Sequence, residues 1–157
     1  MTRLRALLAA SALLLAACPV AGMHVPAGDF ALAVATTDLA PGDSLRMTAT
    51  LANPGADTLR LAFDGDCVVT FHIRSEPDQA VIEPGGDPPC GRVPPETIVL
   101  APGETRRFEH EWIAPAAAPH AYTAYAILGE HDVLRGDERD FKAGHRSNEI
   151  AIQVRPR

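Results

Sequence analysis

The chain has 157 residues, with 14 Lys and Arg against 20 Asp and Glu and a formal net charge of −6. This length is typical of a single domain with one hydrophobic core. An acidic surface repels phosphate backbones, so nucleic acid is excluded as the expected partner.

The first segment has the build of a secretory signal. Arg3 and Arg5 precede an apolar run from Ala6 to Ala17, and the run ends at Cys18. A run of roughly a dozen residues is too short to span a bilayer, which takes about 20. We therefore predict that residues 1–17 are a signal peptide. An alternative is ordinary secretion with cleavage near Ala21-Gly22-Met23.

The four residues Leu15-Ala16-Ala17-Cys18 resemble the lipobox of bacterial lipoproteins, which implies lipidation at Cys18. Two or three acyl chains hold a protein stably at a membrane. The resemblance implies an extracytoplasmic location in the cell envelope. Position 19 is proline and not the aspartate associated with inner-membrane retention. The resemblance therefore favours attachment to the outer membrane, facing the periplasm, in a cell with two membranes. The mature formal charge would be −8, since the leader removes two arginines and no acid. Residues 18–28 contain Pro and Gly and are expected to be a tether.

Beyond the tether, apolar residues alternate with polar ones along short segments, which is typical of half-buried strands. We expect about nine strands, at 29–36, 44–52, 58–63, 68–74, 80–83, 96–101, 105–113, 120–128 and 148–154. No convincing helix is expected outside the leader. Residues 29–157 are therefore predicted to form one all-β domain, an Ig-like antiparallel β-sandwich of about 7–9 strands.

Two segments share a turn pattern. "LAPGDS" at 39–44 and "LAPGET" at 100–105 each place Pro-Gly before an outgoing strand. Proline presets φ for the second position of a turn, and glycine supplies the positive φ of a type II turn. Two independent turns are favoured over a duplicated domain.

After lipidation of Cys18, two cysteines remain, Cys67 and Cys90. In an oxidising compartment such a pair predicts a disulfide, worth roughly 3 kcal/mol if unstrained. A reactive thiol or a metal ligand is the competing interpretation, but neither cysteine lies in a close-spaced ligand motif.

The segments "TATLANPGADTLRLAF", "CVVTFHI", "LAPGETRRFEHEW" and "HAYTAYAIL" together resemble the bacterial Ig-like domains typified by the intracellular proteinase inhibitor BsuPI. The resemblance covers about residues 30–128 and implies the sandwich fold more strongly than it implies inhibition. The secretory signal departs from the family's intracellular label. No position matches a reactive-site motif, so binding residues stay unknown.

Sequence signatures of catalysis are absent, so we predict no enzyme, no cofactor and no metal. The six histidines lie singly. Alternation places His72 among solvated residues, and it makes His110 the histidine that could be partly buried beside Phe108 and Trp112. Asp64, Asp66 and Asp78 lack the spaced oxygen set of a calcium loop, so solvated turns are favoured.

Two tyrosines lie in the segment 120–128. Tyr122 is placed to bond across a sandwich corner, and Tyr125 fits better an exposed aromatic used for binding. Trp112, the single tryptophan, is expected to pack against Leu32, Phe71 and Ile150. The acid-rich segment from 130 is expected to be a charged, exposed hairpin or loop.

These features predict a lipid-anchored, non-catalytic binding module, with proteinase inhibition implied by the resemblance alone. Its expected partners are the membrane, through the N-terminal lipid, and a protein that the sequence does not name. The alternative is a structural envelope lipoprotein that acts as a spacer or an assembly subunit. A binding module should expose an apolar or aromatic patch at one end of the sandwich, whereas a spacer should not.

Overall fold

The computed structural model describes residues 28–64, 67–87, 96–116 and 120–155. This part of the chain contains thirteen β-strands in three sheets and no helix. Consequently, no described helix is long and apolar enough to cross a bilayer. The prediction of an all-β sandwich is confirmed.

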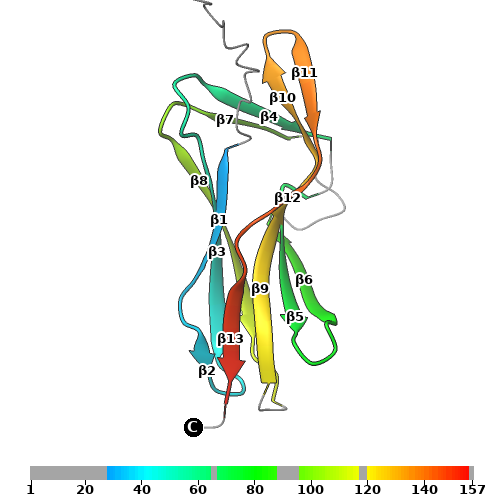
Figure 1. Ribbon diagram of the computed structural model, residues 1–157. Helices are drawn as coiled ribbons and strands as arrows, with labels where there is room; N and C mark the ends of the chain where they lie inside the picture. Colours follow the sequence, from blue (N-terminus) through cyan, green and yellow to red (C-terminus); the bar gives the residue numbers. More distant parts are fainter. Residues whose placement is uncertain (1–27, 65–66, 88–95, 117–119, 156–157) are drawn as a thin grey trace, which may run out of the picture.

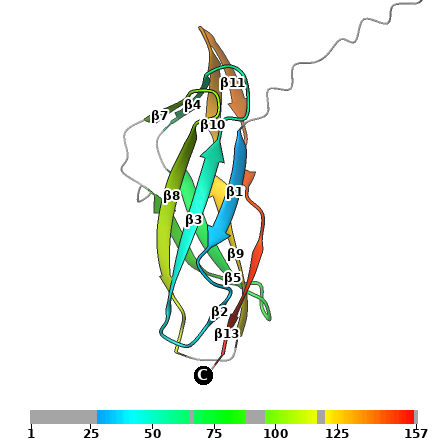
Figure 2. The ribbon, with the colours of Figure 1, turned by 90° about the vertical axis from the view of Figure 1, so that its left-hand side faces the viewer.

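The first sheet of the sandwich, sheet A, contains three antiparallel strands. Their order is β1 (Asp29–Val34), β3 (Ser44–Ala52) and β8 (Thr105–Ile113). Burial alternates along each strand, as the sequence pattern predicted. Figure 2 shows sheet A in front of the second sheet.

The second sheet, sheet B, covers the inner face of sheet A. Its order is β2 (Asp38–Leu39), β13 (Ile150–Val154), β9 (His120–Leu128), β5 (Val69–Ser75) and β6 (Val81–Asp87), and β12 (His145–Arg146) pairs with β9. The short strand β2 runs parallel to β13, while the other pairings are antiparallel.

A third sheet, which we call the cap sheet, covers one end of the sandwich. Its order is β11 (Glu138–Lys142), β10 (His131–Arg135), β4 (Leu59–Phe63) and β7 (Glu96–Leu100). Figure 1 shows it at the end of the molecule opposite the C-terminus. We expected the segments 58–63 and 96–101 as strands of a single sandwich, and the separate sheet corrects that expectation. The charged segment from 130 forms a hairpin, β10–β11, as expected.

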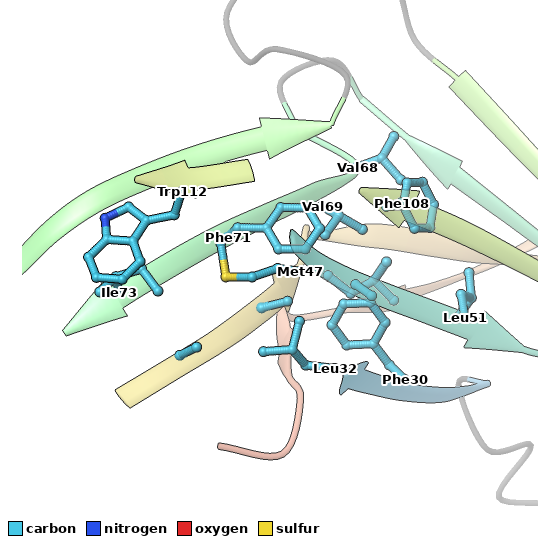
Figure 3. Packing of buried hydrophobic residues seen from close by; sticks show 14 of the residues in the cluster. Phe30, Leu32, Met47, Leu51, Val68, Val69, Phe71, Ile73, Phe108 and Trp112 are labelled. Atoms are coloured by element: carbon cyan, nitrogen blue, oxygen red, sulfur yellow. The ribbon is translucent and has the colours of Figure 1, made fainter. Parts of the chain in front are cut away.

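The core lies between the inner faces of sheets A and B. Figure 3 shows side chains from both sheets, among them Met47 and Phe71, pointing into this space. Large and small residues are complementary across β5 and β9, where Phe71 pairs with Ala126 and Ile73 with Ala124. All four of these residues are fully buried. Such alternation lets the two sheets interdigitate at close packing.

Both predicted Pro-Gly turns are confirmed. Gly42 has φ of 84° and Gly103 has φ of 76°, values that favour glycine. In each turn the amide of the fourth residue donates to the carbonyl of the first, at 3.0 Å for Asp43 and 2.9 Å for Glu104. The carboxylates of the same two residues accept from the first residue's N–H at 2.9 and 2.8 Å. Each acid therefore closes its own turn.

An asparagine side chain covers the outer edge of β1. Asn148 Oδ1 accepts from Leu32 N at 2.8 Å, and Asn148 Nδ2 donates to Leu32 O at 3.1 Å. The amide thus takes the place of a neighbouring strand at this point. Because open strand edges pair readily with other chains, this contact protects the edge of sheet A.

The chain joins the fold at the end that carries the cap sheet. Gly28 is buried, and a Cβ there would lie 2.7 Å from Ala52 O and 2.9 Å from Leu51 Cδ1. Only glycine permits so close an approach at its φ of 27°.

Three predicted features fall wholly or partly outside the described residues. The signal peptide lies outside the described residues. The lipidated tether, which begins at Cys18, also lies outside them apart from Gly28. Of the predicted disulfide, Cys90 lies outside. Cys67 lies just before β5, half-buried. Its carbonyl oxygen would be 2.2 Å from a Cβ on Gly129. The Cys67–Cys90 disulfide stays a prediction.

The predicted burial of Trp112 is confirmed, since it is 5% exposed. The aromatic neighbour that the structure shows is Tyr122, whose ring lies edge-on with centroids 5.3 Å apart. The sequence did not indicate this pair.

We expect Trp112→Ala to lower the free energy of unfolding by about 3–5 kcal/mol, because the change leaves a large cavity in the core. Chemical denaturation measures this loss. Tryptophan emission of the native protein should be blue-shifted and protected from quenchers. Val99→Ala, at an exposed position, is the control and should change stability little. An unchanged midpoint for Trp112→Ala would contradict the packing described.

Candidate binding surface

The cap sheet is assembled from three excursions of the chain out of the sandwich. Strand β4 lies between β3 and β5 in sequence, β7 lies between β6 and β8, and the β10–β11 hairpin follows β9. All three excursions leave from the same end of the sandwich (Figure 1). In other sandwiches such end segments are loops that carry binding residues. Here they pair into a sheet, which gives that end a defined surface.

One face of the cap sheet continues the main core. Its inward side chains are apolar and buried, and they belong to the same cluster as the sandwich core: Leu59, Leu61, Phe63, Ile98, Leu100 and Val133. The cap sheet and the sandwich therefore share one hydrophobic interior. This burial fixes which face of the cap sheet points outward.

Asn53 holds the cap sheet to the sandwich. The residue follows β3 and is 5% exposed. Its Nδ2 donates to Asp57 O at 2.8 Å and to Leu100 O at 3.0 Å, and its Oδ1 accepts from Gly55 N at 3.1 Å. The side chain thus links the start of β4 to the end of β7, so both strands are positioned by one buried amide.

The opposite side of the cap sheet, which we call the outer cap face, points away from the core. By strand alternation it carries Arg60, Ala62, Thr97, Val99, Asp132, Leu134, Arg139 and Phe141. Two large apolar residues on it are exposed, Phe141 at 62% and Val99 at 47%. Arg139 Nη1 contacts Asp132 Oδ2 at 3.2 Å, so this acid is paired across the hairpin.

Charge is segregated between the two faces of β11. Arg139 and Phe141 lie on the outer cap face, while Glu138, Asp140 and Lys142 lie on the other side. Lys142 Nζ contacts Asp140 Oδ2 at 2.8 Å, within that second group. The acidic residues of this strand are therefore turned away from the exposed phenylalanine.

A small cavity of about 80 Å³ borders Phe141. It is lined by Asp64, Glu130, His131, Asp132 and Phe141. Three carboxylates beside an aromatic ring make this corner of the surface unfavourable for anions. This holds for the corner beside Phe141, where Asp132 is paired with Arg139, and not for the part of the face that carries Arg60.

His131 was missed as a buried residue by sequence reasoning, which singled out His110 instead. His131 is 2% exposed, its Nδ1 donates to Gly129 O at 2.8 Å, and its ring lies 5.2 Å from that of Phe63. The burial of His131 follows from strand alternation, because His131 shares the inward face of β10 with Val133. His110 is half-buried and stacks on Phe71 at 5.4 Å, which agrees with its expected packing role.

Tyr125 is not the exposed binding aromatic that we expected. It does point away from the core, but it is 5% exposed. The guanidinium of Arg146 lies 4.2 Å from its ring centre on the outer face of sheet B, and His72 stacks beside it at 4.9 Å. The contact with Arg146 could not be foreseen, because that residue arrives from the separate short strand β12.

His72 is half-buried in this stack. Burial, and secondarily the charge of Arg146, lower its pKa below 6.5. Thr70 Oγ1 lies 2.9 Å from His72 Nε2. These contacts place His72 in a structural cluster of the sheet surface.

The described residues contain no group of three or more His, Cys, Asp or Glu side chains that could hold a metal ion. Among the aspartates weighed for calcium, Asp64 lines the small cavity, Asp66 lies outside the described residues, and Asp78 belongs to the turn before β6. The absence of enzymatic activity and of a cofactor stays a prediction.

Comparison with known proteins finds no matching family model and no matching curated protein. Among solved structures, the chain is similar to Spo0M, a sporulation control protein of Bacillus subtilis, with TM-score 0.48 and 14% identity over 83% of this chain and 50% of that one. It is also similar to a cycloisomaltooligosaccharide glucanotransferase of Paenibacillus sp., with TM-score 0.47 and 17% identity over 81% of this chain and 14% of that one. The chain thus spans half or less of the length of these two proteins.

We expect the stability of the protein to depend on pH through His72. The folded state favours neutral His72, so the His72 ring takes up its proton at a higher pH in the unfolded chain than in the folded protein. The contribution of neutral His72 to the free energy of unfolding is therefore complete above a pH of about 6.5. It is lost as the pH falls toward the pKa of His72 in the folded protein. NMR titration of the His72 ring should give a midpoint below 6.5, and Arg146→Gln should raise it. A wild-type midpoint at or above 6.5 would show that burial does not disfavour the charged ring.

Proposed function

We propose that the chain is a lipid-anchored, extracytoplasmic, non-catalytic binding module whose binding surface is the outer cap face. The observation that carries the proposal is the exposure of Phe141 and Val99 on one face of a sheet at one end of the sandwich. Phe141 and Val99 lie on the two edge strands of the cap sheet, β11 and β7, so the exposed apolar side chains stand at both edges of the outer cap face. The cap sheet also shares a core with the sandwich and is hydrogen-bonded to it through Asn53, as expected of a preformed binding surface.

The proposal places the protein in the cell envelope, on the outer membrane facing the periplasm if the cell has two membranes. Lipidation at Cys18 supplies the attachment. Proteinase inhibition is the narrower form of the function, and it is supported by the resemblance to BsuPI-like domains alone. No position in the sequence matches a reactive-site motif, so no residue is assigned to inhibition.

The second candidate is a structural envelope lipoprotein that acts as a spacer or an assembly subunit. It is favoured by one observation, the position of the two ends of the described chain. Gly28 packs at the cap end, whereas β13 ends at the opposite end of the sandwich (Figure 1). A domain with this arrangement separates whatever is joined to its two ends.

Anchorage is tested by Cys18→Ser, which we expect to abolish incorporation of labelled fatty acid and to move the protein out of the membrane fraction. The reason is that two or three acyl chains supply the membrane affinity. A mutant that still takes up label and sediments with membranes would contradict the proposal.

In the same cells, a photoreactive amino acid placed at Phe141 or at Ile113 separates a binding module from a spacer. Ile113 is a matched control, because it is 58% exposed and ends β8 away from the cap sheet. A binding module gives adducts with an envelope component at position 141 in excess of those at position 113. Equal adducts at both positions would favour the spacer.

A further inference from the structure

The place where the chain joins the domain determines which end is held near the membrane. Gly28 is fixed against Leu51 and Ala52 at the cap end. Ten residue steps separate it from Cys18, a reach of at most about 35 Å and a typical span of about 18 Å for a flexible segment. An anchor at Cys18 therefore keeps the cap sheet closer to the bilayer than any other part of the domain.

The outer cap face has the composition of a surface that rests in the interface of a membrane. Phe141 and Val99 are exposed, Leu134 is half-buried, and Arg60 lies on the same face together with the Arg139–Asp132 ion pair. Aromatic and aliphatic side chains enter the region between headgroups and acyl chains, and arginines reach the phosphates above them. The acids of β11 lie on its opposite side, so they do not oppose this contact.

The carboxylates around the cavity beside Phe141 decide which lipids fit. Asp64, Glu130 and Asp132 would be repelled by anionic headgroups but not by zwitterionic ones, whose ammonium groups are positive. The tether raises the local concentration of the surface, so weak contacts are sufficient to hold the domain down.

We propose that the outer cap face docks on the surface of a zwitterionic phospholipid bilayer and fixes the orientation of the anchored domain. This inference rests on the proposed function, both on lipidation at Cys18 and on the outer cap face as the binding surface. The docked domain stands with the C-terminal end of the sandwich away from the membrane.

The test uses the mature protein, as isolated from membranes, in vesicles of phosphatidylethanolamine and phosphatidylcholine that contain brominated acyl chains. A tryptophan is introduced as Phe141→Trp or, as the matched control, Ile113→Trp. Emission from native Trp112 is subtracted by means of the unsubstituted protein. We expect the tryptophan at 141 to be blue-shifted and quenched by the brominated lipid, while that at 113 keeps its emission.

Hydrogen exchange on the unsubstituted protein gives a second measurement that needs no variant. Amides of β11 and β7 should exchange more slowly in vesicles than in the unlipidated protein, while β13 should be unchanged.

Equal quenching at 141 and 113, or no quenching at either with the protein bound to vesicles, would overturn the docking and leave the proposed function standing. Failure of the protein to bind vesicles at all would instead refute lipid anchorage, and the docking with it. Adducts from position 141 to a protein in the envelope, combined with no quenching in vesicles, would assign the outer cap face to a protein partner.

Discussion

One buried amide, that of Asn53, connects the cap sheet to the sandwich at the points where the chain crosses between them. The chain passes from β3 to β4 of the cap sheet and, later, from β7 of the cap sheet to β8, and Asn53 bonds at both crossing points. Its side chain joins Asp57 and Leu100, while its backbone N–H donates to Glu104 O at 3.0 Å and its carbonyl accepts from Gly103 N at 2.8 Å. A buried carbonyl that loses its donor costs about 1–3 kcal/mol, so the amide is difficult to replace. The Pro-Gly turn of residues 101–104 is therefore more than a hairpin connection. Its second role is to present the backbone groups that Asn53 binds.

Sequence reasoning located nine of the thirteen described strands but did not indicate which strands pair with one another. Alternation in β3, β5 and β8 tells which side chains are buried, because a strand has a period of two. It does not tell which strand lies alongside, so β4 and β7 were expected in the sandwich when they belong to the cap sheet. Side chains that arrive from distant segments were equally invisible. Arg146 covers Tyr125, and Asn148 covers the edge of β1. The turns were predictable in detail, because proline and glycine fix φ locally.

The candidate site was predictable only as a type of surface. The sequence suggested that a binding module would expose apolar residues at one end, and the structure has Phe141 and Val99 exposed on the outer cap face. Phe141 lies in a charged segment that gave no apolar signal. Its exposure follows from the hairpin register, in which Phe141 pairs with Asp132 on the outward side while His131 turns inward. Together with Gly28 at the same end, this register connects the proposed lipid anchor to the proposed binding surface. The net negative charge of the chain then acts as a constraint on which membrane or partner the surface accepts.

The central claim is that the cap sheet is a distinct surface held to the sandwich through Asn53. Native-state hydrogen exchange of Asn53→Ala measures this most directly, with Asn148→Ala as the control that removes a hydrogen-bonded asparagine side chain at the edge of β1. The account predicts that Asn53→Ala removes protection from β4, β7 and β10 while β5 and β9 stay protected, and that Asn148→Ala affects β1 but not the cap sheet. Uniform loss of protection across all three sheets in Asn53→Ala, or no loss in the cap sheet, would contradict it.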